Sequence, residues 1–234
     1  EHLGVYYDSE WATDRKWLVD QLRLTRSCGY RTPMNIEQVI NELDDMLVNV
    51  AEGYRKKKLA ADKRLCVVID TITKLVPARQ LKTFMEGAAK GDTKQARSLQ
   101  AGAISNWMKD VVPKLGATHG TLILVNQERK NMNATGPYDR QWDLPCGEAM
   151  KFDNSMRVRV GYAKPIKVGE VIVGTEHHCT LMKSKGGAAY GQFTFYSANG
   201  LGDCDRGFDH AREIVAEMKL RGAPFYRKVE EKDG

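Results

Sequence analysis

Three short apolar runs, each followed by polar residues, constrain the fold of this chain more than any other feature. The clearest is Leu65–Asp70, a run of apolar residues that ends in a carboxylate. A continuous run of this kind is typical of a strand covered on both faces in a parallel sheet. The runs Leu3–Tyr7 and Thr121–Val125 have the same character and are followed by Asp8-Ser9-Glu10 and Asn126-Gln127. We therefore expect a parallel sheet with polar residues at its carboxyl edge.

Helical periodicity fills the intervals between these runs, which is the pattern of an α/β fold. Asn35 and Gln38 predict the start of a helix that Gly53 closes. A second helix is predicted from Asp92, and Pro113 together with a following glycine is expected to end it. Further expected segments are a short helix after Asp14, polar connections over 78–91 and 128–146, and a last helix over 208–222.

The last third of the chain changes to the alternating pattern of antiparallel strands. The expected strands cover residues 156–162, 170–185 and 192–196, and glycines separate them. The predicted architecture is therefore a parallel central sheet with helices on both faces, extended by antiparallel strands.

Composition limits the class of protein. Hydrophobic residues make up 42% of the 234 residues, which is enough for a packed core. The sequence has no membrane-spanning apolar stretch and no signal-peptide pattern, so we expect a protein without a membrane partner. Its five cysteines include no CxxC pair, which favours a reducing cytoplasm. A net charge of +6 suits a polyanionic partner without establishing one.

The polar strand ends have the chemistry of a nucleotide site. A buried strand that ends in Asp70-Thr71 has the pattern of a Walker B site, whose carboxylate holds Mg²⁺ beside a nucleotide. Buried strands also end in Asp that caps a following helix, so this motif alone leaves both interpretations open. Glu10 suits a general base that orients an attacking water, and the Gln127 amide suits a hydrogen bond to a γ-phosphate. The three strand ends together are more specific than any one of them.

Four segments, Val5–Glu10, Cys66–Thr71, Leu122–Gln127 and Met182–Lys185, occur in the order and spacing of the RecA recombinase family. The chain resembles this family over residues 3–222, and the phage UvsX-type branch is especially similar around the first segment. The resemblance implies a RecA-like P-loop NTPase core.

The resemblance also implies roles for individual residues. Glu10 matches the glutamate that activates the hydrolytic water, and Asp70 matches the Walker B carboxylate that holds the metal ion. Gln127 matches the glutamine that couples the γ-phosphate to a DNA-binding loop. The other expected ATP-binding residues are Asp14 and Trp17 at the adenine (Trp17 replacing the family's usual tyrosine), Thr71, and the pair Lys183 and Lys185, which would reach the ATP of a neighbouring subunit.

Two DNA-binding loops are implied by the same resemblance. The first would lie within Arg79–Gly91, with Arg97 as a DNA-contacting residue in the following helix, and the second would be Glu128–Cys146. In the second loop, aromatic rings either contact bases or anchor the loop to the domain. The expected DNA-binding residues besides Arg97 are Arg79, Lys82 and Lys90 in the first loop, and Arg129, Lys130, Tyr138, Arg140 and Trp142 in the second.

One departure from the family pattern matters. No GxxxxGK[ST] phosphate-binding loop occurs in the sequence, whereas in the family this loop precedes the strand at Leu3–Tyr7. We therefore expect residues 1–222 to be a RecA-like core without its first strand and P-loop helix, and residues 223–234 to be a charged tail. The alternative is a paralogue that does not bind ATP.

The function that the resemblance implies is ATP-dependent homologous recombination and DNA repair. With ATP and Mg²⁺ as cofactors, the complete protein would form a helical homo-oligomeric filament on single-stranded DNA. It would then exchange that strand with double-stranded DNA. The alternatives are another ATPase of the same core, such as a helicase or a clock-type ATPase, and a non-hydrolysing DNA-binding or regulatory paralogue. The Lys183-Ser184-Lys185 pattern and the long loop after Gln127 favour the recombinase.

Overall fold

The structure of the chain is a computed structural model. It describes residues 3–22, 28–60, 62–85, 93–131, 135–136, 142–147, 149–187, 189–199, 207–209 and 212–216. The chain divides into two compact units, Glu1–Asn154 and Ser155–Gly234, and each is described by itself.

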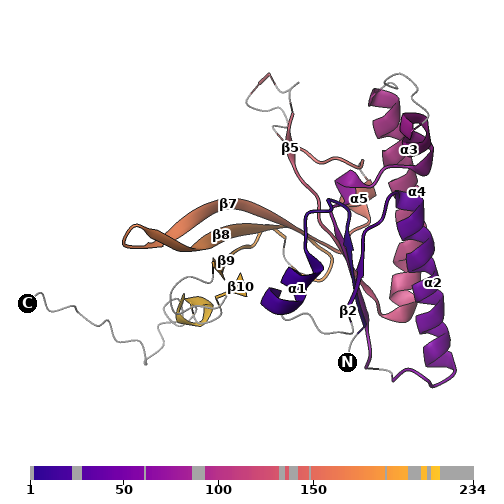
Figure 1. Ribbon diagram of the computed structural model, residues 1–234, viewed down its shortest axis with the longest axis horizontal. Helices are drawn as coiled ribbons and strands as arrows, with labels where there is room; N and C mark the ends of the chain where they lie inside the picture. The colour runs from indigo at the N-terminus through magenta and orange to yellow at the C-terminus, as the bar shows by residue number, and fades with distance from the viewer. Residues whose placement is uncertain are drawn as a thin grey trace, which may run out of the picture. The chain divides into compact units, whose positions relative to one another are not determined.

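The first unit is built on a four-stranded parallel sheet in the order β2-β1-β3-β4 (Figure 1). Its strands are β1 (Leu3–Asp8), β2 (Cys28–Arg31), β3 (Leu65–Asp70) and β4 (Thr121–Leu124). The three apolar runs thus form neighbouring parallel strands, as predicted. The sequence did not predict β2, because its four residues contain no apolar run.

Helices lie on both sides of this sheet, as expected. α2 (Ile36–Arg55) and α4 (Thr93–Thr118) pack together on one side, and α1 (Arg15–Leu22) lies on the other (Figure 1). The Asn35 side chain accepts a hydrogen bond from the Gln38 backbone N–H at 2.9 Å, so the predicted cap of α2 is confirmed.

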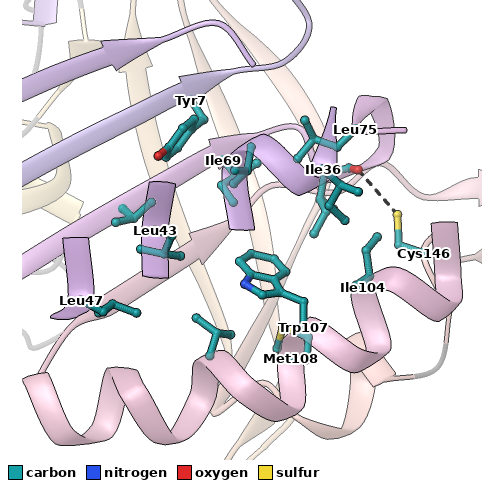
Figure 2. Packing of buried hydrophobic residues seen from close by; sticks show 14 of the residues in the cluster. Tyr7, Ile36, Leu43, Leu47, Ile69, Leu75, Ile104, Trp107, Met108 and Cys146 are labelled. Atoms are coloured by element: carbon teal, nitrogen blue, oxygen red, sulfur yellow. Dashed lines mark hydrogen bonds between the residues drawn. The ribbon is translucent and has the colours of Figure 1, made fainter. Parts of the chain in front are cut away.

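The hydrophobic core lies between the sheet and the α2–α4 layer (Figure 2). Tyr7 and Ile69 from the strands, Leu43 from α2 and Trp107 from α4 are almost completely buried in it. Along β3, fully buried residues alternate with half-buried ones. The second face of the sheet, which carries Tyr6, is therefore covered less completely than the core face.

The helix α4 continues through Pro113 to Thr118, so the prediction that Pro113 and Gly116 end it is wrong. Pro113 is exposed, and water can therefore solvate the carbonyl that its ring leaves without a partner. The helix is closed further on, where the Gly120 N–H donates to the Leu115 carbonyl at 2.9 Å.

A second correction concerns residues 78–91, which were expected to be an irregular connection. They begin with the helix α3 (Ala78–Met85). The carboxylate of Glu37, at the start of α2, accepts a hydrogen bond from the Ala78 N–H at 2.8 Å and so satisfies one of the donors at the start of α3.

The second unit is an antiparallel sheet in the order β10-β9-β8-β7, whose strands pair with one another. They are β7 (Met156–Val168), β8 (Val171–Ser184), β9 (Gln192–Ala198) and β10 (Gly207–Phe208). The three predicted strands are confirmed, although β7 is longer than expected. Phe208 lies in β10 and not in the last helix, of which the structure describes residues 212–216. No helix in the described part of the chain is long and apolar enough to span a bilayer.

Candidate functional site

The polar residues after β1, β3 and β4 meet at the carboxyl edge of the parallel sheet. The Ser9 hydroxyl donates a hydrogen bond to the Thr71 carbonyl at 2.6 Å, which joins the end of β1 to that of β3. The Gln127 amide donates to the Glu10 carboxylate at 3.0 Å. Glu10, Asp70 and Gln127 thus follow or end three adjacent strands, in agreement with the topology expected for them.

Asp8 organises the turn that carries Glu10, and sequence reasoning missed this role. Its side chain is 1% exposed and accepts hydrogen bonds from the backbone N–H groups of Glu10 at 3.1 Å and Thr13 at 2.8 Å. The Tyr30 hydroxyl adds a bond of 2.9 Å. Burial alone would raise the pKa of Asp8, but these hydrogen bonds to its ionised form outweigh burial and hold the pKa below its usual value.

Asp70 is held by a tyrosine that sequence reasoning also missed. The Tyr6 hydroxyl donates to Asp70 Oδ2 at 2.8 Å. Burial, followed by the bond to Asp70, raises the pKa of Tyr6 to about 12, so its phenol remains a donor at neutral pH. The other carboxylate oxygen, Oδ1, accepts no hydrogen bond from the described residues.

The donor set around Asp70 fits Mg²⁺ that arrives together with phosphates. The described residues contain no group of three His, Cys, Asp or Glu side chains that could hold a metal ion. In proteins Mg²⁺ usually keeps several waters and is bound by one or two carboxylates and substrate phosphates. A single carboxylate with one oxygen still available is suited to this arrangement.

The long loop over 128–146 begins and ends beside the strand ends. The Asn126 amide donates to the Pro145 carbonyl at 3.1 Å, and the Cys146 thiol donates to the Ile72 carbonyl at 3.8 Å (Figure 2). Burial raises the pKa of Cys146 to about 11, so this thiol is a neutral anchor at physiological pH. The Thr71 hydroxyl is completely buried and donates to the Val125 carbonyl at 2.9 Å, and its ATP-binding role stays a prediction.

The described part of this loop contains a small antiparallel hairpin. β5 (Arg129–Lys130) pairs with β6 (Trp142–Asp143), and Lys130 stands opposite Trp142. Trp142 is 48% exposed, so about half of its surface is covered by the protein, and both expected roles of its ring stay predictions. The expected DNA-binding residues Tyr138 and Arg140 lie outside the described residues.

The predicted first DNA-binding segment is partly helical. Arg79 and Lys82 lie three residues apart on α3, on the same side of the helix. Arg97 lies in α4, but its side chain is outside the part of the chain that the structure describes, as is the whole of Lys90.

The remaining predicted ATP-binding residues occur in both units. Asp14 is exposed before α1, and its carboxylate accepts a hydrogen bond from the Lys16 N–H at 2.9 Å. Trp17 lies in α1, with its side chain outside the described part. Lys183 lies near the end of β8 and Lys185 follows that strand, so both belong to the second unit.

The described residues form an α/β fold in which polar strand ends meet at the carboxyl edge of a parallel sheet. Residues 56–201, more than half of the chain, match the family model of the RecA N-terminal domain. The chain therefore belongs to the RecA family.

Curated relatives agree with this assignment. The chain is 29% identical over 186 residues to Protein RecA of Desulforapulum autotrophicum, a match that covers 78% of this chain and 47% of the relative. It is 28% identical over 139 residues to the mitochondrial DNA repair protein recA homolog 3 of Arabidopsis thaliana, covering 59% and 31% of the two chains. The matched region is thus less than half the length of either relative.

A crystal structure of the RadB recombinase superimposes with a TM-score of 0.47 at 13% identity, covering 83% of this chain and 74% of that one.

Proposed function

We propose that this chain is the ATPase and DNA-binding core of a recombinase. The recombinase would assemble on single-stranded DNA with ATP bound between subunits, and it would exchange that strand with a duplex. Family membership and relatives whose names are Protein RecA and DNA repair protein support this proposal. The observation that carries it is the Glu10–Gln127 hydrogen bond, which joins a general base to a phosphate-sensing amide.

The residues at the three strand ends would have different roles in ATP hydrolysis. Mg²⁺ bound with ATP neutralises charge on the phosphates, and Asp70 is the residue that would hold it. Glu10 accepts a proton from the attacking water, while the turn organised by Asp8 keeps the Glu10 backbone in place. A γ-phosphate oxygen would compete with Glu10 for the Gln127 amide, so that nucleotide binding releases the base.

Gln127 also connects the nucleotide site to DNA. Only Glu128 separates it from β5, so a movement of Gln127 reaches Arg129 and Lys130 through the backbone. These two cations neutralise DNA phosphates, which gives affinity without sequence preference. The exposed ring of Trp142 adds a surface on which a base can stack.

Hydrolysis requires a phosphate-binding loop from outside these 234 residues, because the sequence contains no GxxxxGK[ST]. We propose that residues 1–222 are the core of a longer protein that supplies this loop and forms a helical homo-oligomer in the cytoplasm. Within that protein, Asp14, Trp17 and Thr71 would contact the nucleotide. Residues 223–234 would lead into a further region.

A strand-exchange assay on the product of the complete reading frame tests the proposal. We expect ATP-dependent pairing of circular single-stranded DNA with homologous linear duplex, and its loss in Glu10→Gln and Asp70→Asn. The exposed Asp45 on α2 provides a control, since Asp45→Asn should pair strands normally. Duplex unwinding without pairing would indicate a helicase. DNA binding without ATP turnover would indicate a non-hydrolysing paralogue, and either result overturns the proposal.

A further inference from the structure

Two stacked tyrosines each bond a different strand-end carboxylate. The Tyr6 hydroxyl donates to Asp70 Oδ2 at 2.8 Å, and the Tyr30 hydroxyl lies 2.9 Å from Asp8 Oδ2. Their rings are nearly parallel, with centroids 6.2 Å apart and planes at 9°. Tyr6 also stands opposite Tyr30 in the register of β1 and β2. The phenol that reaches Asp70 is therefore fixed by a strand and by a neighbouring ring.

We propose that Tyr6 is a positioning residue for the Mg²⁺ site, holding Oδ2 of Asp70 so that Oδ1 remains for the metal ion or its water. The inference rests on the proposed function, because it takes Asp70 as the residue that holds Mg²⁺. Tyr6 acts only through Asp70 and bonds no metal itself.

The physical effect of Tyr6 is preorganisation. An aspartate without such a partner samples several rotamers, and this freedom is lost when its carboxylate binds a metal ion. The Tyr6 hydroxyl removes part of that freedom before the ion arrives. Hydrogen-bond partners of metal-binding side chains typically change metal affinity by about 10- to 100-fold when removed. Because Asp70 would supply one ligand among several, we expect an effect of about tenfold.

Tyr6→Phe tests the inference, with Tyr7→Phe as a matched control. Tyr7 is the next residue, and its hydroxyl donates to Glu42 at 3.0 Å on the core side of the sheet, away from Asp70. In the product of the complete reading frame, Mn²⁺ binding in the presence of ATP is measured by electron paramagnetic resonance. We expect Tyr6→Phe to raise the dissociation constant for Mn²⁺ about tenfold and Tyr7→Phe to leave it nearly unchanged.

The Mg²⁺ dependence of ATP hydrolysis gives a second readout. Tyr6→Phe should raise the half-saturating Mg²⁺ concentration while the rate at saturating Mg²⁺ stays near that of the wild type. A purely structural role would lower the maximal rate and leave the half-saturating concentration unchanged. Replacing Tyr6 by 3-fluorotyrosine, which keeps the ring and the hydroxyl donor, should restore Mn²⁺ affinity.

The outcomes separate this inference from the proposed function. Wild-type Mn²⁺ affinity in Tyr6→Phe, together with its loss in Asp70→Asn, overturns the role of Tyr6 and leaves that of Asp70 intact. Unchanged affinity in Asp70→Asn overturns the metal site and the proposed function with it. A 3-fluorotyrosine protein that binds Mn²⁺ as weakly as Tyr6→Phe also counts against the inference, because its hydroxyl is present.

Discussion

The three carboxylates at the strand ends lie at one edge of the sheet but have different surroundings, and they differ in what they leave for a ligand. Asp8 is almost completely buried and enclosed by backbone donors, which suits a structural anion. Asp70 has one oxygen engaged by Tyr6, which leaves the other for a ligand. Glu10 accepts a hydrogen bond from the Gln127 amide, a donor for which a phosphate oxygen would compete in the proposed site. Asp8 is thus the carboxylate whose hydrogen bonds are best satisfied within the fold, and we propose no catalytic role for it.

The first prediction concerns Asp8. Asp8→Asn replaces a charged acceptor by a neutral amide and leaves buried N–H groups without a good partner. We expect the free energy of unfolding to fall by about 2–3 kcal/mol, measured by urea denaturation of the chain. Asp45→Asn, on the exposed side of α2, should change it by less than about 0.5 kcal/mol. Equal effects of the two substitutions would contradict the role assigned to Asp8.

The same carboxylate gives a second prediction, on pH. The pKa of Asp8 is lower in the folded chain than in the unfolded one, so its stabilising effect is complete above the unfolded-state value. This effect is lost as the pH falls through the lowered folded-state pKa. Urea midpoints of the wild type and Asp8→Asn should therefore differ most at neutral pH and converge in acid. A difference between the two urea midpoints that stays constant down to about pH 2 would contradict a stabilising effect of the ionised Asp8 carboxylate.

Some site residues could be predicted from the sequence and others could not, for a physical reason. Asp70 ends one short apolar run and Gln127 comes two residues after another, so a local pattern places them at the sheet edge. Asp8 has the same local pattern, but its role depends on Tyr30, which lies 22 positions away on a strand without an apolar run. Tyr6 likewise depends on a contact with Asp70, 64 positions away. These side-chain contacts depend on which strands pair and in which register, and neither can be derived from a single sequence.

At the scale of elements, a strand that is buried along its length can be predicted from its run of apolar residues. An element that depends on contacts with distant residues cannot be predicted in this way. β3 is buried or half-buried along its whole length, and the structure confirms its predicted bounds. The start of α3 is capped by Glu37, which lies 41 positions earlier in the sequence. No residue next to α3 therefore predicts where this helix begins. In α4, Pro113 indicated a helix end, yet packing of the helix against the core carries it five residues further.

The third prediction follows from this conflict within α4. Pro113→Ala restores a backbone N–H in an exposed part of the helix and removes the proline ring. We therefore expect the free energy of unfolding to rise by about 1–3 kcal/mol. Gly116→Ala is the matched control, because a Cβ there meets nothing within 4 Å and should add about 0.5–1 kcal/mol. Urea midpoints at a constant m value measure both changes. A loss of stability in Pro113→Ala would show that the helix is not continuous at this position.

The fourth prediction concerns the β5–β6 hairpin. Replacing Arg129 and Lys130 by Ala should weaken the binding of single-stranded DNA to the chain. The dependence of log K on log salt should also flatten by about 0.7 for each DNA phosphate that is no longer neutralised. Trp142→Ala should weaken binding by about 1–3 kcal/mol per stacked base without changing that slope. Fluorescence anisotropy with two oligonucleotides of unrelated sequence measures both. A loss confined to one sequence would mean that the hairpin reads bases.

At the scale of the whole molecule, the predicted ATP-binding residues are divided between the two units. The strand ends belong to Glu1–Asn154, whereas Lys183 and Lys185 belong to Ser155–Gly234. The sequence predicts a strand over 170–185 with both lysines on one face, whereas β8 ends at Ser184 and Lys185 directly follows it. Their spacing does not reveal their target, which only the family resemblance implies, since a site between subunits is a property of the assembly. The proposed filament accounts for this division by placing the lysines at the nucleotide of the neighbouring subunit.

The last prediction tests whether the lysines act between subunits. In the product of the complete reading frame, Lys183→Ala combined with Lys185→Ala should abolish DNA-stimulated ATP hydrolysis, because two cations would no longer stabilise charge on the transferred phosphoryl group. ATP affinity of the isolated subunit should remain near that of the wild type. Lys164→Ala with Lys167→Ala, two exposed lysines of β7, provides a control that removes the same charge from the same unit.

Mixing variants makes this test decisive. A Glu10→Gln subunit still has both lysines, and the double-alanine subunit still has Glu10, so a mixed filament contains intact composite sites wherever the two meet in the right order. We therefore expect a mixture of the two inactive proteins to recover part of the ATPase activity. Random assembly of equal amounts would place an intact site at about a quarter of the interfaces, since each interface draws its two sides independently. Recovery should vanish when Glu10→Gln is introduced into the double-alanine protein as well. Turnover by the double-alanine protein alone, at the wild-type rate, would instead contradict a catalytic role for the two lysines.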